Sequence, residues 1–294
     1  MPKREKKKPK GYEWRHIENK KLVYTVYFLL RLSVVLMLVA QFFNQNYENV
    51  LLCVLTLVLF MLPSAFERRL HLDLPDTLEI IILLFIYAAE ILGEIRDFYI
   101  DFPFWDTMLH TMNGFLCAAI GFALVDILNR EEKVSLYLSP FFMAVVAFCF
   151  SMTIGVLWEF FECSMDQMLY LDMQKDTVIN TISSVMLDPS GLNNRVMIED
   201  ILDTIVVTAD GQQIALGLGG YLDIGILDTM KDLFVNFIGA VVFSTIGYFY
   251  VKSRGEGKFA RRFIPQVVDV PLENAEPRQP KARKKTKKSG KPEE

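Results

Sequence analysis

The sequence predicts an all-α fold, a polytopic membrane helix bundle with about six transmembrane helices. Its 294 residues are 52% hydrophobic and 13% aromatic, and the apolar runs are too long and too frequent for the core of a soluble protein. Lysine and arginine are concentrated near the two ends of the chain, which leaves a long apolar middle. Together these observations favour a multi-pass protein of the cell membrane.

Residues 1–21 form a basic arm with nine Lys or Arg against three Glu. The apolar run after it lacks the small-residue cleavage site of a secretory signal, so we expect it to stay attached as the first membrane helix, residues 22–44. Arg31 lies inside this helix. Its side chain can extend toward the near interface or pair with an acid on a neighbouring helix, and the sequence leaves both open.

Five more membrane helices are expected, separated by turns and loops. The second is closed by Pro63, and the third begins at Pro75-Asp76-Thr77. The aromatic stretch DFYIDFPFW before the fourth helix is typical of a membrane interface. The transmembrane domain covers residues 22–252, with its later helices at 50–66, 77–93, 106–128, 136–161 and 227–252.

One long connection, residues 166–227, separates the last two helices. The stretch 166–228 holds ten Asp or Glu against two basic residues, so we do not expect it to span. The segment LDMQKDTVINTISSVML predicts an amphipathic helix, and the residues around Asp210-Gly211 predict two short strands. The glycine-rich GLGGYLDIG lacks phosphate-binding spacing and is expected to be a flexible loop.

Residues 253–294 form a second basic segment, rich in proline and ending in a Lys-rich run. This composition predicts a disordered cytoplasmic tail. We expect the two basic ends to contact anionic lipid headgroups of the membrane and do not expect nucleic acid as a partner.

Charge distribution also predicts the topology. The basic or mixed segments alternate with connections poor in Lys and Arg, which places both termini in the cytoplasm. The third and fifth helices then end, and the fourth and sixth begin, at the same extracytoplasmic face. The long connection 166–227 is an extracytoplasmic insert.

Polar side chains concentrate at that face on four different helices. The fifth helix ends in WEFFECSMD, where three carboxylates stand at i, i+3 and i+7 and share one helix face. The sixth helix begins with three polar residues four apart. The set comprises Glu94, Asp106, His110, Asn113, Glu159, Glu162, Asp166, Asp228, Asp232 and Asn236.

So many carboxylates in a low dielectric repel one another unless some are protonated or a cation lies among them. The donors are carboxylates and amides with one histidine, which suits Mg²⁺, Mn²⁺ or Ca²⁺. We expect a divalent-cation site formed by His110, Glu159, Glu162, Asp228 and Asp232, with Glu94, Asp106, Asn113, Asp166 and Asn236 around it. No other cofactor is expected, and the sequence names no catalytic residue.

Three functions remain open. The first is a metal-dependent enzyme acting on a lipid or lipid-linked substrate. The second is an ion- or proton-coupled transporter that uses the acids as a relay. The third is a structural or partner protein whose acidic insert is held by an ion. The sequence does not set the oligomeric state.

A resemblance joins several of these motifs. The pair Asp106/His110, the WEFFE motif and the D-x-x-x-D-x-x-x-N-x-x-GA pattern resemble the YjdF-like family of bacterial integral membrane proteins over residues 105–247. In the last pattern the matching residues are Asp228, Lys231, Asp232, Gly239 and Ala240. The resemblance implies a bacterial inner-membrane protein and no particular activity, because the family is uncharacterised. The long 181–227 connection and the Lys-rich tail depart from the family pattern, and D-x-x-K-D-x-x-x-N occurs twice, at 172–180 and 228–236.

Overall fold

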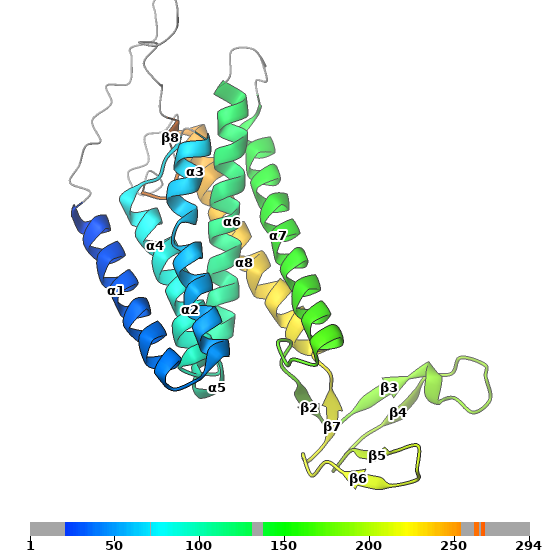
Figure 1. The fold of residues 1–294 in the computed structure, drawn as a ribbon. Helices are drawn as coiled ribbons and strands as arrows, with labels where there is room; N and C mark the ends of the chain where they lie inside the picture. The colour runs from blue at the N-terminus through cyan, green and yellow to red at the C-terminus, as the bar shows by residue number, and fades with distance from the viewer. Residues whose placement is uncertain (1–20, 71, 131–137, 254–261, 265, 268–294) are drawn as a thin grey trace, which may run out of the picture.

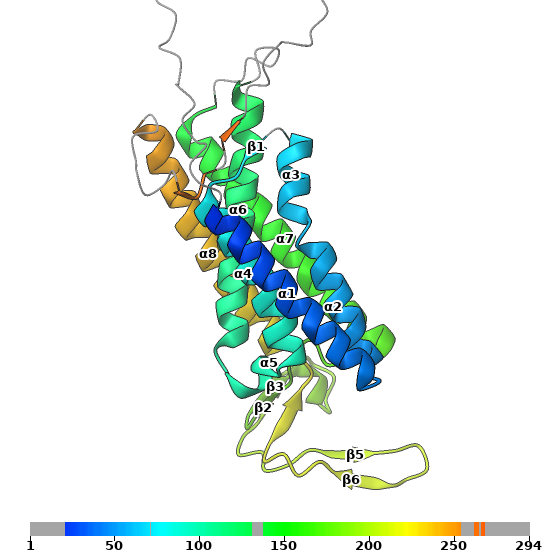
Figure 2. The same ribbon diagram turned by 60° about the vertical axis from the view of Figure 1, so that its left-hand side comes forward.

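A computed structural model describes residues 21–70, 72–130, 138–253, 262–264 and 266–267. Figure 1 shows a bundle of long helices with a set of short strands beyond one end. We call this end the β-rich end. Helix α7 (Pro140–Leu169) ends there and helix α8 (Ile226–Lys252) begins there. We call the opposite end of the bundle the far end. A second view shows the strands at the same end (Figure 2).

The first helices form one side of the bundle. Helix α1 (Lys21–Phe43) runs toward the β-rich end, and α2 (Tyr47–Leu59) returns beside it and leads into α3 (Leu62–Leu70). Asn46 begins α2, because its side chain accepts a hydrogen bond from the backbone N–H of Asn49. Pro63 does not close the helix as predicted. It lies in the first turn of α3, where a missing N–H costs nothing.

The third predicted helix contains a change of helix type. Helix α4 (Asp76–Tyr87) passes directly into η1 (Ala88–Ile95), a π-helix. The short helix α5 (Phe98–Asp101) follows, and the ring of Phe98 packs edge-on against Trp105 at 4.9 Å between centroids. The aromatic stretch thus forms a packed corner between η1 and the next long helix.

Three long helices form the other side of the bundle. They are α6 (Trp105–Arg130), α7 (Pro140–Leu169) and α8 (Ile226–Lys252). Ser139 begins α7 by accepting from the backbone N–H of Phe142, with Pro140 as its first residue. Helix α7 ends later than the expected 136–161, at Leu169. The acidic motif Trp158–Asp166 is therefore helical throughout.

Two glycines let α6 and α8 touch. A Cβ atom on Gly114 would lie 2.0 Å from the carbonyl oxygen of Asn236, and one on Gly239 would lie 2.0 Å from that of Thr111. Only glycine permits such an approach, as in other closely packed membrane helices. This contact brings the first turns of α6 and α8, and therefore their polar residues, together.

Among the residues that the structure describes, the helices have two large apolar cores and a smaller cluster of Leu74, Leu78 and Leu116. One lies between α6, α7 and α8 and includes Phe122 and Phe243, both fully buried. The other lies between α1, α2, α4 and η1 and includes Val34 and Leu83. Within the described residues, five helical stretches are long and apolar enough to cross a membrane: Lys21–Phe43, Tyr47–Arg69, Trp105–Asp126, Pro140–Leu169 and Ile226–Lys252.

The insert is built of strands, so the all-α prediction holds for the bundle but not here. The prediction of an amphipathic helix at LDMQKDTVINTISSVML is wrong. This segment forms strand β2 (Thr177–Ile179), strand β3 (Ile182–Ser184) and the 3₁₀ turn η2 (Val185–Leu187). Strands do flank Asp210-Gly211 as predicted, and GLGGYLDIG contains β7 rather than only loop. The antiparallel pairs are β2 (Thr177–Ile179) with β7 (Tyr221–Asp223), β3 (Ile182–Ser184) with β4 (Val196–Ile198), and β5 (Ile205–Val207) with β6 (Gln213–Ala215).

Part of the segment predicted to be a disordered tail packs on the bundle. Ile264 is buried in the core between α6, α7 and α8, and the ring of Phe263 lies 5.4 Å from that of Phe115. Strand β8 (Gln266–Val267) pairs antiparallel with β1 (Leu72–Asp73). The prediction is therefore wrong for these residues. The Lys-rich run and the arm 1–20 lie outside the described residues.

Candidate metal site

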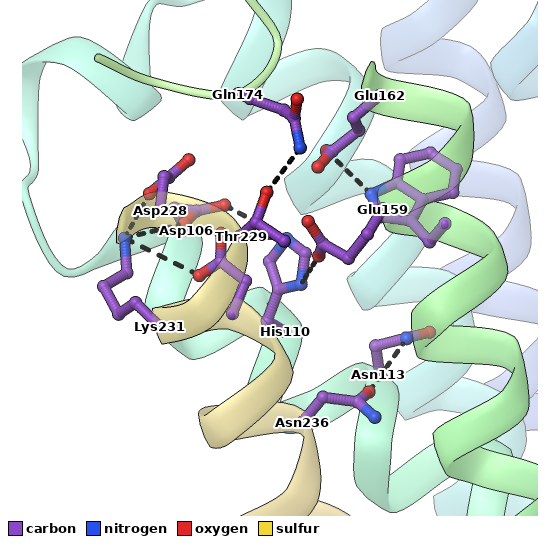
Figure 3. A network of polar contacts seen from close by, with 12 residues as sticks. Asp106, His110, Asn113, Glu159, Glu162, Gln174, Asp228, Thr229, Lys231 and Asn236 are labelled. Carbon is purple, nitrogen blue, oxygen red and sulfur yellow. Dashed lines mark hydrogen bonds and ion pairs between the residues drawn. The ribbon is translucent and has the colours of Figure 1, made fainter. Parts of the chain in front are cut away.

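His110 lies at the centre of a polar cluster between α6, α7 and α8 near the β-rich end (Figure 3). Its two ring nitrogens face different acids. Nε2 lies 3.3 Å from Asp106 Oδ1, one turn earlier on α6, and 3.9 Å from Asp232 Oδ2 on α8. Nδ1 lies 3.7 Å from Glu159 Oε1 on α7. His110 therefore connects all three helices.

The α7 side of the cluster contains two buried glutamates. Glu159 is 4% exposed and Glu162 is 8% exposed. The indole N–H of Trp158 donates to Glu162 Oε1 at 2.8 Å, which fixes that carboxylate. Oε2 of Glu159 is buried and makes no hydrogen bond at normal geometry within the described residues, although the Thr229 side chain is a neighbour of this carboxylate. A buried carboxylate oxygen without a donor is costly, so this atom is suited to a ligand.

The α8 side of the cluster is organised by a lysine. Lys231 Nζ donates to Asp228 Oδ1 at 2.7 Å and lies 3.3 Å from Asp106 Oδ2 and 3.6 Å from Asp232 Oδ1. Asp228 Oδ2 also accepts from the backbone N–H of Lys175. The aspartates thus already have a cation, whereas no lysine or arginine of the described residues forms an ion pair with the two glutamates on α7.

Two ligand-like groups share the histidine. Three atoms from His110, Glu159 and Glu162 lie within 4.8 Å of one another, and so do three from Asp106, His110 and Asp232. Those spacings suit a single ion bound at ~2.0–2.6 Å from each ligand atom. The first group is the better fit, because all three of its residues are buried and no lysine competes there.

A short loop, residues 171–176, lies over the cluster on the side of the insert. Asp166, near the end of α7, accepts from the backbone N–H groups of Met173 at 2.7 Å and Gln174 at 2.8 Å. The side chain of Gln174 donates in turn to the Thr229 hydroxyl on α8. The loop therefore joins α7 to α8 across the opening between them (Figure 3).

The remaining predicted residues lie around the cluster or outside it. Asn113 donates to Asn236 at 3.2 Å, one turn deeper, and this pair forms the floor below His110. Asp166 serves the loop rather than the cluster, and Glu94 lies exposed on η1. Of the five expected ligands, the structure brings His110, Glu159 and Glu162 into one group, places Asp232 at the other imidazole nitrogen and holds Asp228 on Lys231.

Below the Asn113–Asn236 pair, the interface between α6 and α8 is mainly apolar, with Ser244 as a buried polar residue on α8. Ala118, Ala119, Phe122, Ala240 and Phe243 are all fully buried there. The two phenylalanine rings pack edge-on at 6.2 Å between centroids. This packed layer separates the cluster from the polar residues of the far end.

Sequence reasoning missed several contributors. Lys231 was noted only as part of a family motif, although its spacing of three from Asp228 was a visible sign of an ion pair. The Trp158 indole lies four residues before Glu162, which is hydrogen-bonding distance on a helix. Gln174 and Thr229 gave no signal, because their contact depends on the path of the insert.

The three helices that carry the cluster lie within the range matched by a family profile. The profile of the DUF2238 family, described as predicted membrane proteins, matches residues 26–253. The chain belongs to this family. A Thermotoga maritima protein described only as uncharacterized is 24% identical over 109 residues, which cover 36% of this chain and 53% of that protein. The chain spans about half the length of this curated relative. No solved structure matches.

Membership of the DUF2238 family confirms the expectation of a membrane protein. It does not confirm the YjdF-like label that the motifs had suggested. The matched range begins in α1 and ends just after α8, so the helical bundle and the insert belong to the family together, while the Lys-rich run lies beyond the match.

Proposed function

We propose that this DUF2238 protein binds one divalent cation through His110, Glu159 and Glu162 and uses it in a reaction on a lipid or lipid-linked substrate. The observation that carries the proposal is the buried, unpartnered Oε2 of Glu159, beside an imidazole nitrogen and a second buried glutamate. A bound cation would neutralise the two glutamates, which have no lysine within the described residues near them as the aspartates do.

The contacts of the histidine support this choice of ligands. When Nδ1 binds the ion, Nε2 carries the proton and can donate to Asp106 at 3.3 Å, with the Asp232 carboxylate 3.9 Å away. Metal-binding histidines are commonly held in this way by a carboxylate, which fixes the tautomer and raises ligand basicity. Lys231 in turn holds both aspartates. Asp106 and Asp232 are therefore positioning residues in this proposal.

Three protein ligands leave coordination positions for water or substrate. A cation there would polarise a phosphoryl or carbonyl oxygen, and a carboxylate of the cluster would move a proton. Two carboxylates and one imidazole suit Mn²⁺ well among the hard divalent ions, with Mg²⁺ and Ca²⁺ as alternatives.

The surroundings of the site favour an amphiphilic substrate. Trp158 holds Glu162 yet is 44% exposed, and its neighbours Phe160 and Phe161 are 64% and 44% exposed. Aromatic rings at the end of a membrane helix are typical of the lipid interface. A headgroup could approach the glutamates from the lipid side of α7 while the 171–176 loop covers the insert side.

The packing below the cluster favours this reaction over coupled transport. A proton or ion relay needs polar groups through the membrane, and the buried Phe122 and Phe243 lie across the route between α6 and α8. We also propose that the β-rich end is extracytoplasmic and the membrane a bacterial inner membrane, on the distribution of Lys and Arg.

The test is a cation titration of purified protein followed by calorimetry and metal analysis. Wild-type protein should bind about one Mn²⁺ per chain, and Glu159→Gln should lower the affinity at least tenfold because a neutral amide replaces a carboxylate ligand. Asp101→Asn is the matched control, since Asp101 is an exposed acid at the same end of the bundle.

The binding result shows whether the cation binds at a specific site or only to surface carboxylates. Equal, weak binding by wild type, Glu159→Gln and Asp101→Asn would mean that the acids bind cations only non-specifically, and the proposal would fail. Release of phosphate or a lipid product from membrane-lipid extracts, dependent on added Mn²⁺ and lost in Glu159→Gln, is the expected activity.

A further inference from the structure

A groove on the lipid-facing side of the bundle, far in sequence from the metal site, carries an arginine. It is formed between α1 and α3 and is lined by Tyr24, Tyr27, Phe28, Arg31, Leu32, Val35 and Ser64. Apart from Ser64, every lining residue lies on α1, whose apolar window is only 11% buried inside the protein. The surface of this groove therefore faces the acyl chains and headgroups of the surrounding bilayer.

Arg31 is directed toward one end of its helix. Its guanidinium lies over the ring of Tyr27 at 4.8 Å from the centroid. Tyr27 precedes Arg31 by one turn, so the charge points toward the Lys21 end of α1. Long cationic side chains extend in this way toward the nearest interface. Between the two possibilities left open by the sequence, the geometry supports this one.

The groove offers hydrogen-bond donors and no acid. Arg31 contributes its guanidinium, and Tyr24, Tyr27 and Ser64 contribute hydroxyls. The Tyr27 hydroxyl is buried and has no hydrogen-bond partner at normal geometry within the described residues, although Ser64 is its neighbour. Tyr27 itself is only 8% exposed. A buried hydroxyl beside a cation is suited to an anionic oxygen ligand.

Two acids lie within electrostatic range of Tyr27, but neither lines the groove. Glu67 accepts a hydrogen bond from the backbone N–H of Leu74, and Glu79 is 4% exposed on α4. Among the described residues that line the groove, Arg31 is therefore the one that carries a charge.

We propose that this groove binds the phosphate of an anionic phospholipid, with Arg31 pairing with the phosphate and the Tyr27 hydroxyl donating to it. The lipid's acyl chains would lie against the exposed Phe28, Leu32 and Val35. A single arginine with three hydroxyls favours a net anionic headgroup over a zwitterionic one, because no carboxylate lining the groove offers a partner for a headgroup ammonium. Arg31 lies ten residues beyond Lys21, about 15 Å along the helix, so the headgroup would be drawn below the usual interface.

The experiment is native mass spectrometry of delipidated full-length protein titrated with phosphatidylglycerol, phosphatidylcholine or diacylglycerol. Wild type should bind one phosphatidylglycerol most tightly and diacylglycerol least. Arg31→Gln should weaken phosphatidylglycerol binding about tenfold, Tyr27→Phe by a smaller factor, and Arg31→Lys should retain part of the affinity.

Lys252→Gln is the matched control. Lys252 also lies over an aromatic ring, Tyr248 at 5.5 Å, but outside the groove. Its removal should leave the tightest lipid unchanged. If Arg31→Gln does not fold, Arg31→Lys and Tyr27→Phe decide the question on their own.

Three results would overturn the proposal. One is an unchanged affinity in the Arg31 and Tyr27 variants. Another is equal binding of diacylglycerol, which lacks phosphate. The last is a change of oligomeric mass in Arg31→Gln with lipid binding retained, which would make the groove a contact between copies of the chain. Cation binding at His110 should be the same in all these variants, so the outcome does not depend on the metal site.

Discussion

Replacing Gly239 by alanine tests how closely α6 and α8 must approach to form the site. The new Cβ would lie 2.0 Å from the Thr111 carbonyl oxygen, whereas ordinary contact begins at 3.4 Å, so the helices must separate locally by about 1.4 Å. Asp232 lies two turns earlier on the same face of α8, and its 3.9 Å distance to His110 should grow by a similar amount. The imidazole then loses one of its two orienting acids.

Two quantities should change in Gly239→Ala. Overpacking costs about 1–3 kcal/mol of folding free energy, and loss of a positioning carboxylate typically costs about 10–100-fold in metal affinity. We expect a lower thermal midpoint in detergent and a Mn²⁺ affinity reduced within that range.

Gly247→Ala is the control for this experiment. It makes the same chemical change on α8, but the new Cβ would meet the Phe122 ring at 2.9 Å, in the apolar layer away from the cluster. It should lower stability and leave cation affinity unchanged. Wild-type stability and affinity in Gly239→Ala would refute the close contact and the reasoning built on it.

Three further predictions concern single groups. Trp158→Phe removes an indole N–H from the site and should lower Mn²⁺ affinity about tenfold in calorimetry, whereas Trp105→Phe, which loses a similar bond to a backbone carbonyl on η1, should not. Lys231→Gln leaves the aspartates without their cation. Thermal unfolding should show a loss of about 1 kcal/mol of folding free energy, a figure discounted because the lysine side chain is 44% exposed. Added divalent ions should restore more stability to this variant than they add to wild type. Hydrogen bonds from the Ser190 hydroxyl and neighbouring backbone N–H groups hold the pKa of Asp188 below its usual value. The order of the 188–194 turn should therefore persist at neutral pH and fall as the pH drops below about 4 in hydrogen exchange, a change that Asp188→Asn should remove.

Helix spacing accounts for the part of the site that could be predicted. Residues three or four apart share a helix face, and alternating helix directions place the ends of α7 and the beginnings of α6 and α8 at one end of the bundle. His110 and Asp232, 122 positions apart, therefore lie 3.9 Å from each other. What spacing cannot give is which acid faces which ring nitrogen, because that depends on side-chain rotamers and on partners such as Lys231.

Non-local pairing explains the error in the insert. The segment around Val178 has helical periodicity, yet it forms β2 because β7, more than forty residues later, pairs with it. The preceding loop is held extended by acids on α7 and α8, which accept the backbone N–H groups of residues 173–175. Local propensity is overridden when the hydrogen bonds of a segment are supplied from elsewhere.

Averaged composition explains the error in the tail. A window rich in lysine and proline predicts disorder, but Phe263 and Ile264 form a short apolar pair within it. These two side chains pack against Phe115 and the core formed by α6, α7 and α8. A composition averaged over about forty residues does not detect so short an apolar pair.

The proposed site binds one cation through a single histidine and two glutamates. Pulsed electron paramagnetic resonance of protein loaded with one equivalent of Mn²⁺ tests it most directly, because the electron spin-echo is modulated by nitrogen bound to the metal. We predict modulation from one imidazole that disappears in His110→Ala and persists in His71→Ala, which removes a histidine that is not part of the proposed site. A Mn²⁺ signal with no nitrogen modulation, or one indifferent to His110, would contradict the account.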